Sequence, residues 1–113
     1  MPDKKEPGMK IFDLYKMKSF PYENRNKNVF YHSKEFKTRI IDLSAGEEMP
    51  ECVMVSYAIF LVLQGEAIVT VDSKDSVIGT GKCLISEPAM LSLKTKIGVK
   101  IMGIQINKNK ESD

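Results

Sequence analysis

Residues 39–65 read RIIDLSAGEEMPECVMVSYAIFLVLQG, and the prediction of the fold begins from this stretch. Its first five residues form a β-rich run, and the polar residues 44–48 that follow have the composition of a turn. Residues 49–55 form a short run with an alternating pattern, as in a β-strand. Residues 58–63 are apolar at every position, and this pattern indicates a strand buried on both faces. The stretch therefore predicts several short β-strands joined by turns.

Two glycines frame most of this stretch at a characteristic separation. The first motif of the cupins runs Gly, five residues, His, one residue, His, three or four residues, Glu, six residues, Gly, and Gly46 and Gly65 match its two glycines. The chain resembles the small single-domain, RmlC-like cupins over residues 29–106. Residues 60–67, FLVLQGEA, match the characteristic hairpin of that family. The resemblance therefore implies a tight turn at residues 64–66 between two paired strands.

The metal-binding positions of the cupin motifs hold other residues in this chain. In the first motif the two histidines and the glutamate are replaced, by Cys52, Met54 and Ala58. A degraded second motif spans residues 79–93, where Lys82 replaces the Asp of the family and the expected His falls on Leu91 or Ser92. Metals such as Fe(II), Mn(II) or Ni(II) need converging imidazole and carboxylate donors. The metal-dependent activities of the family are therefore not expected here, and no cofactor is predicted.

The remainder of the chain predicts a single all-β domain. Short β-rich runs recur at a spacing of about 8–12 residues with turn residues between them. Together with the resemblance, this pattern predicts an antiparallel jelly-roll β-barrel over residues 11–107. Residues 1–10 are predicted to be a flexible leader and residues 108–113 a polar tail. Residues 11–20 fit a short strand or one helical turn that packs on the outside of the barrel.

Composition argues against several classes of partner and location. The formal net charge is +2, and the basic residues are scattered without interleaved aromatic residues, so no nucleic-acid partner is expected. No apolar run approaches the roughly 20 residues that cross a bilayer, and no signal-peptide segment follows the lysine-rich start. We therefore expect a cytoplasmic protein with no membrane partner. In that compartment Cys52 and Cys83 are expected as reduced thiols.

The interior of the predicted barrel has three interpretations. Its replaced positions can be pliable apolar fillers that close a dry barrel. Alternatively, the interior accepts a small, largely apolar molecule, and the residues predicted to bind it are Cys52, Met54, Ala58, Phe60, Met90 and Ser92. As a third interpretation, Cys52 and Met54 form a soft sulfur site with Cys83, of the kind that selects Cu(I). Because the one histidine, His32, lies outside both motifs, no catalytic residue is predicted.

The favoured function follows from these alternatives. We predict a metal-free cupin-type protein that binds a small, largely apolar molecule without clear catalytic activity. The alternatives are a soft-metal cupin, which could be an enzyme, and a dimeric structural or regulatory module. Because residues 58–63 are apolar on both faces, Ile59, Leu61 and Leu63 are expected to face outward. Such a stripe indicates a subunit interface, and cupins are frequently dimers, so a homodimer is expected.

Overall fold

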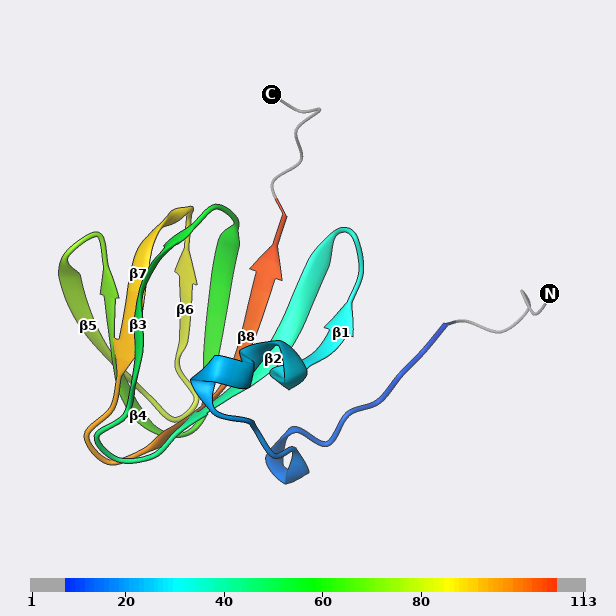
Figure 1. Cartoon of the computed structure of the whole chain (residues 1–113), viewed down its shortest axis with the longest axis horizontal. Helices are drawn as coiled ribbons and strands as arrows, with labels where there is room; N and C mark the ends of the chain where they lie inside the picture. The colour runs from blue at the N-terminus through cyan, green and yellow to red at the C-terminus, as the bar shows by residue number, and fades with distance from the viewer. Residues whose placement is uncertain (1–7, 108–113) are drawn as a thin grey trace.

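The computed structural model describes residues 8–107, and most of the regular structure in this part of the chain is β-strand (Figure 1). Its strands are β1 (Val29–His32), β2 (Phe36–Leu43), β3 (Glu48–Met54), β4 (Tyr57–Val71), β5 (Lys74–Gly79), β6 (Cys83–Ser86), β7 (Ala89–Lys94) and β8 (Val99–Ile106). Two 3₁₀-helices precede them, η1 (Leu14–Lys16) and η2 (Tyr22–Asn28). All strand pairs are antiparallel, so the predicted all-β class is confirmed.

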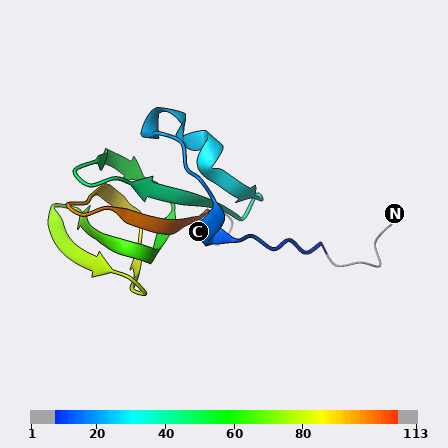
Figure 2. The ribbon, with the colours of Figure 1, turned by 90° about the horizontal axis from the view of Figure 1, so that it is seen from below.

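The strands form one curled sheet whose two layers share β4. The order along the sheet is β1-β2-β8-β4-β7-β3, and β5 and β6 both pair with β4. The first half of β4 pairs with β8 and β6, and together with β2 and β1 these make the first layer. The second half pairs with β5 and β7, which make the second layer with β3. Figures 1 and 2 show the strands curling around a common interior, as in the predicted jelly roll.

The predicted hairpin turn at residues 64–66 is wrong, because β4 continues through it. This strand is 15 residues long, and an irregularity between Val62 and Gln64 marks the place where it leaves the first layer for the second. Gly65 has a φ of +86°, and a Cβ built there would overlap the Gly98 carbonyl. The glycine therefore lets β4 bend tightly against the start of β8 without reversing direction.

The hydrophobic core fills the space between the two layers. Alternation along β4 turns Ala58, Phe60 and Val62 inward in the first layer, and all three are buried. Ile101 on β8 lies opposite both Ile41 and Val62 in the sheet. The second layer closes the core with side chains from three of its strands, Ala67, Val69, Ile78, Leu91 and Leu93. Side chains of both layers therefore meet in one core.

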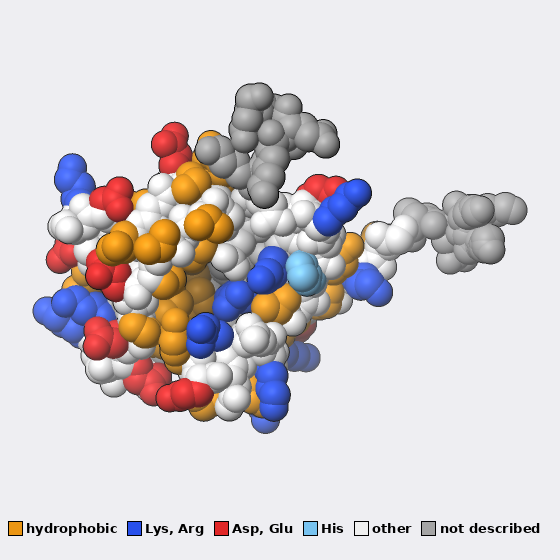
Figure 3. All heavy atoms as spheres, turned by 45° about the horizontal axis from the view of Figure 1, so that its top comes forward, with side chains coloured by type: hydrophobic (Ala, Val, Ile, Leu, Met, Phe, Trp, Pro, Cys, Tyr) orange, Lys and Arg blue, Asp and Glu red, His pale blue; other side chains and the backbone are white. Residues whose placement is uncertain are grey.

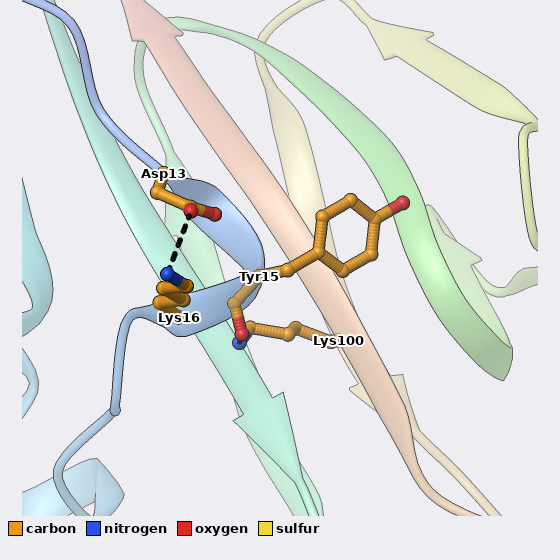
Figure 4. A network of polar contacts seen from close by, with 4 residues as sticks. All are labelled: Asp13, Tyr15, Lys16 and Lys100. Atoms are coloured by element: carbon orange, nitrogen blue, oxygen red, sulfur yellow. Dashed lines mark hydrogen bonds and ion pairs between the residues drawn. The ribbon is translucent and has the colours of Figure 1, made fainter.

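The segment around η1 packs on the outer face of the first layer, as predicted for residues 11–20. The buried Lys100 ammonium donates hydrogen bonds to the carbonyls of Tyr15 (3.0 Å) and Met17 (2.9 Å). The Tyr15 hydroxyl donates to the Leu63 carbonyl at 3.2 Å. Figure 4 shows Tyr15 of η1 and Lys100 of β8, beside the ion pair between Lys16 and Asp13 (3.9 Å). Polar contacts to β4 and β8 therefore tie the segment to the sheet.

Only part of the predicted domain division falls on described residues. Most of the predicted leader (residues 1–7) and the whole predicted tail (residues 108–113) lie outside them. Residues 11–20, for which a strand or a helical turn was predicted, contain the single turn η1. Among residues 8–107, no helix has the length and apolar character that a membrane span requires.

Candidate functional site

An open cavity lies between the two layers and borders the hydrophobic core at Ile41 and Phe60. Its volume is about 220 Å³. The strands β2, β4 and β8 form one wall, β3 forms the other, and η2 stands at the rim. The lining consists of Tyr22, Arg25, Arg39, Ile41, Met49, Cys52, Val53, Met54, Phe60, Gly103, Ile104 and Gln105. We call it the apolar cavity. Figure 3 shows a hollow of hydrophobic side chains with Lys and Arg side chains gathered beside it.

A second hollow of about 390 Å³ continues the cavity along the outside of η2. The two hollows share five lining residues, Tyr22, Arg25, Arg39, Ile41 and Met49. The second one also carries four carboxylates, from Glu23, Asp42, Glu47 and Glu48. We call it the acidic groove. The two hollows therefore differ in the charge of their linings, because the lining of the apolar cavity contains no Asp or Glu.

Strand alternation sets the walls of the apolar cavity. Cys52 pairs with Leu91, a core residue, and Met54 lies two residues further along the same face of β3. On the opposite wall, Phe60 of β4 pairs with Gly103 of β8. A Cβ at Gly103 would lie 3.6 Å from the Phe60 ring and 3.4 Å from Ile41 Cδ1. A Cβ there would make ordinary van der Waals contacts, so Gly103, Phe60 and Ile41 lie close together in this wall.

The structure brings together three of the six residues predicted to bind a ligand. Cys52, Met54 and Phe60 all line the apolar cavity. Ala58 is fully buried and is not part of the lining. Met90 and Ser92 flank the core residue Leu91 on β7, so alternation turns both away from the interior, and Met90 is 41% exposed. These two side chains therefore do not line the apolar cavity. Whether the other residues bind a ligand stays a prediction.

Sequence reasoning missed the polar residues of the cavity. Arg39 and Ile41 share one face of β2, and the Arg39 guanidinium donates a hydrogen bond to Gln105 Oε1 at 3.2 Å. The Gln105 amide donates in turn to the Met54 sulfur at 3.0 Å. A side chain from each layer thus takes part in one chain of contacts. The alternation of β2 held a signal for Arg39, but Ile40 and Ile41 are both apolar, so either face was eligible to point inward.

A second guanidinium stands at the rim. Arg25 of η2 donates to the Tyr22 carbonyl at 3.0 Å and lies 4.1 Å from the centroid of the Tyr22 ring. Burial lowers the pKa of Arg39 from its ordinary value, and the nearby charge of Arg25 lowers it further. Arginine remains protonated at neutral pH even so, because its ordinary pKa lies far above 7. The cavity therefore holds two positive charges.

The predicted soft sulfur site is not assembled. Cys83 pairs with Leu61, so it lies on the outer face of the first layer, where it is exposed. Cys52 and Met54 lie inside on β3, and His32 is exposed at the end of β1. Within residues 8–107 no group of three or more His, Cys, Asp or Glu could hold a metal ion. The residues present therefore do not fit the three-histidine, one-glutamate centre that the cupin fold commonly houses.

Comparison with solved structures places the fold. A cupin-superfamily protein from Desulfitobacterium hafniense aligns with a TM-score of 0.67 and 20% identity, over 71% of this chain and 74% of that chain. The Cnp3 cupin domain from Schizosaccharomyces pombe aligns with a TM-score of 0.68 and 20% identity, over 74% and 65% of the two chains. An RmlC-like cupin from Shewanella frigidimarina aligns with a TM-score of 0.66 and 16% identity, over 75% of this chain and 78% of that chain.

Sequence comparison finds no significant match. No protein-family model matches the chain, and no curated protein is significantly similar to it. The structural matches are each 20% identical or less, so they establish the fold and carry no activity or ligand with them. They agree with the resemblance seen in the sequence. The protein thus has the cupin fold.

Proposed function

We propose that the protein binds a small, largely apolar molecule in the apolar cavity. The observation that carries this proposal is the arrangement of Ile41, Met54 and Phe60 around a space that opens to solvent between the layers. Ligand sites are concave, mostly apolar and provided with a few polar groups that orient the ligand. Arg39 and Gln105 are polar groups of this kind.

The size of the cavity limits the ligand. About 220 Å³ lies below the roughly 300–1,000 Å³ of typical ligand pockets. An apolar cavity of about 150 Å³ is nevertheless large enough to bind benzene. The proposed ligand is therefore a molecule of one ring with small substituents, or an aliphatic molecule of similar volume. Met49 and Met54 favour adaptation to its shape, because methionine side chains are unbranched and polarizable.

The proposal is one of binding and not of turnover. No His, Asp or Glu is found among the described residues that line the apolar cavity. The space therefore offers no side chain of the types that most often transfer protons near neutral pH. Cys52 is its one thiol, and it has no histidine beside it in the lining. Ligand capture, delivery or sensing agrees with this set of residues better than acid–base catalysis.

Two-dimensional NMR tests the proposal within a single sample. The ¹H,¹⁵N spectrum is recorded while one-ring compounds that are neutral, anionic or cationic are added at millimolar concentration. Binding in the cavity should shift the amide signals of Cys52, Met54 and Gln105. The amides of Ser76 and Val77 on the exposed edge strand β5 serve as internal controls. If no compound shifts the cavity signals more than the control signals, the proposed function is wrong.

A homodimer through the outer face of the first layer is proposed as well. Ile59 lies opposite both Ile85 and Ile104 there, and Ile85 is 70% exposed. Leu61 is half-buried on the same face. Leu63, which the sequence also placed in this stripe, is buried instead, and Tyr15 covers its carbonyl. The apolar surface available to a second copy is therefore centred on Ile59, Leu61 and Ile85.

A further inference from the structure

We propose that the ligand of the apolar cavity carries a carboxylate, which Arg39 and Arg25 bind while the apolar part of the ligand lies against Phe60 and Met54. This inference rests on the proposed function and adds the chemical class of the ligand to it. Neither arginine belongs to a cupin motif that the sequence revealed. The assignment comes from the charge, hydrogen bonds and position of the two side chains.

The charge of the cavity is unbalanced. Its described lining includes two guanidinium groups and no carboxylate. Within residues 8–107 the one ion pair with atoms within 4.0 Å joins Lys16 and Asp13, and neither residue lines this cavity. The carboxylates of the acidic groove therefore do not pair with Arg25 or Arg39. A partly buried charge without a counter-charge is unfavourable, and an anionic ligand would supply the missing partner.

The guanidinium of Arg39 also has donors to offer. A guanidinium carries five N–H donors, and in the described part of the chain that of Arg39 makes a single hydrogen bond, to Gln105. Because Gln105 is held in turn by the Met54 sulfur, the guanidinium is fixed against the wall of the cavity. A planar, fixed fork of N–H groups matches the two oxygens of a carboxylate. The same donors serve a neutral amide or a cation poorly.

Position separates the charged end of the site from its apolar end. Arg25 lies on η2 at the rim and is exposed, whereas Arg39 is half-buried between η2 and β3. Of the apolar lining residues, Ile41 and Phe60 are buried and Met54 is half-buried. Burial and the charge of Arg25 both lower the pKa of Arg39, so this environment disfavours the cation and an anion would relieve it. The ligand should therefore enter with its apolar end first and its carboxylate toward η2.

A carboxylate is favoured over a phosphate by the number of donors. A phosphate dianion is commonly held by several donors, often backbone N–H groups at a long helix or a glycine-rich loop. The rim here offers the side chains of Arg25 and Arg39 beside the short 3₁₀-helix η2. One fixed guanidinium assisted by a second at the rim suits a monoanion.

Four one-ring probes of similar size test the inference by titration with NMR or calorimetry. Benzoate carries the proposed anion, benzamide is its neutral isostere, benzylamine is a cation and phenyl phosphate is a dianion. Wild-type protein should bind benzoate at least tenfold more tightly than benzamide, with benzylamine weaker still. The preference for benzoate should fall as the salt concentration rises, because ions screen the partly exposed charges.

Three variants locate the charge. Arg39→Met should abolish the preference for benzoate over benzamide, and Arg39→Lys should keep only part of it because the planar fork is lost. Lys74→Met removes one positive charge from the exposed strand β5 and should leave the preference unchanged. Dispersed amide signals in each spectrum establish that the variant is folded. The comparison of probes on the wild-type protein needs no variant, so it stands even if Arg39→Met does not fold.

Each outcome separates the inference from the proposed function. Equal affinity for benzoate and benzamide, or tighter binding of benzylamine, would overturn the inference and leave an apolar binding protein. Tighter binding of phenyl phosphate than of benzoate would overturn the choice of a carboxylate. A benzoate preference that survives Arg39→Met would show that this residue is not the anion site. Failure of all four probes to shift the cavity signals would count against the proposed function itself.

Discussion

Replacing Gly65 by Ala should destabilise the protein much more than the same replacement at Gly46. The two glycines have nearly the same backbone conformation, with φ of +86° and +87°. Around Gly46 no atom lies within 4 Å of an added Cβ. At Gly65 the Cβ would overlap the Gly98 carbonyl and lie 3.0 Å from Val99 Cα. The two variants therefore share the strain of a positive φ and differ in the backbone collision.

The loss of unfolding free energy can be estimated for each variant from these two contributions. A left-handed conformation costs an L residue roughly 1–2 kcal/mol, which is the loss in unfolding free energy expected for Gly46→Ala. At Gly65 the obstacle is backbone, so either β4 or β8 must move. That movement puts at risk the hydrogen bond from the Glu66 N–H to the Gly98 carbonyl (3.2 Å), worth about 1 kcal/mol, and adds about 1–3 kcal/mol of backbone strain. The expected loss for Gly65→Ala is therefore roughly 3–6 kcal/mol.

Urea unfolding followed by far-UV circular dichroism measures both losses from the midpoint and slope of the transition. Gly65→Ala should lose at least about 2 kcal/mol more than Gly46→Ala, a large share of the 5–15 kcal/mol typical of a domain. A Gly65→Ala chain that never folds while Gly46→Ala folds is the extreme form of the same result. If the two losses agree within about 0.5 kcal/mol, the spread within which surface changes usually fall, the argument from close approach is refuted.

Three further changes test other parts of the structure. Lys100→Met removes the ammonium that holds the segment around η1. Limited chymotrypsin digestion should then cut that segment faster, and the free energy of unfolding should fall by about 1–3 kcal/mol. Lys94→Met, at an exposed position of β7, should change neither the digestion rate nor the stability. Ile85→Asp should convert the proposed homodimer to a monomer in light scattering, and Val77→Asp on β5 should not; a monomeric wild-type protein at micromolar concentration would contradict the dimer. The Thr38 hydroxyl is buried without a hydrogen-bond partner among the described residues, so Thr38→Val should leave the melting temperature unchanged or raise stability by about 1 kcal/mol.

The sequence predicted the strands of this fold well and one connection badly. β2, β3 and β8 appeared as β-rich runs with turn residues between them, because half-buried strands have a two-residue period that is visible locally. The path of β4 through Gly65 was not visible in this way. A glycine between two apolar runs is compatible with a turn and with a bend, and the close approach of Gly98 that decides between them comes from a segment 33 residues later in the chain.

Side-chain direction explains which of the predicted site residues reach the interior. Cys52 and Met54 were placed inside because they share one face of β3 and occupy the ligand positions of the first cupin motif. The second motif is degraded, and alternation on β7 puts Leu91 inside and Met90 and Ser92 outside. A shift of one residue turns every side chain of a strand to the other face. An alignment uncertain by one residue was therefore unable to decide which residues of β7 reach the interior.

The replaced motif positions and the arginines point to the same chemistry. A metal ion held by Cys52 and Met54 would share the cavity with two guanidinium charges, and Ala58 stands where the family has the glutamate that would offset some of that positive charge. Like charges brought together in a partly buried site repel each other strongly. The arrangement that disfavours a cation favours an anion, and Arg39 provides the fork that binds one. A variant with histidines at positions 52 and 54 should therefore bind Co(II) or Zn(II) more tightly when Arg39→Met is added, as calorimetry would measure. Equal metal affinity with and without Arg39 would show that its charge does not govern the cavity.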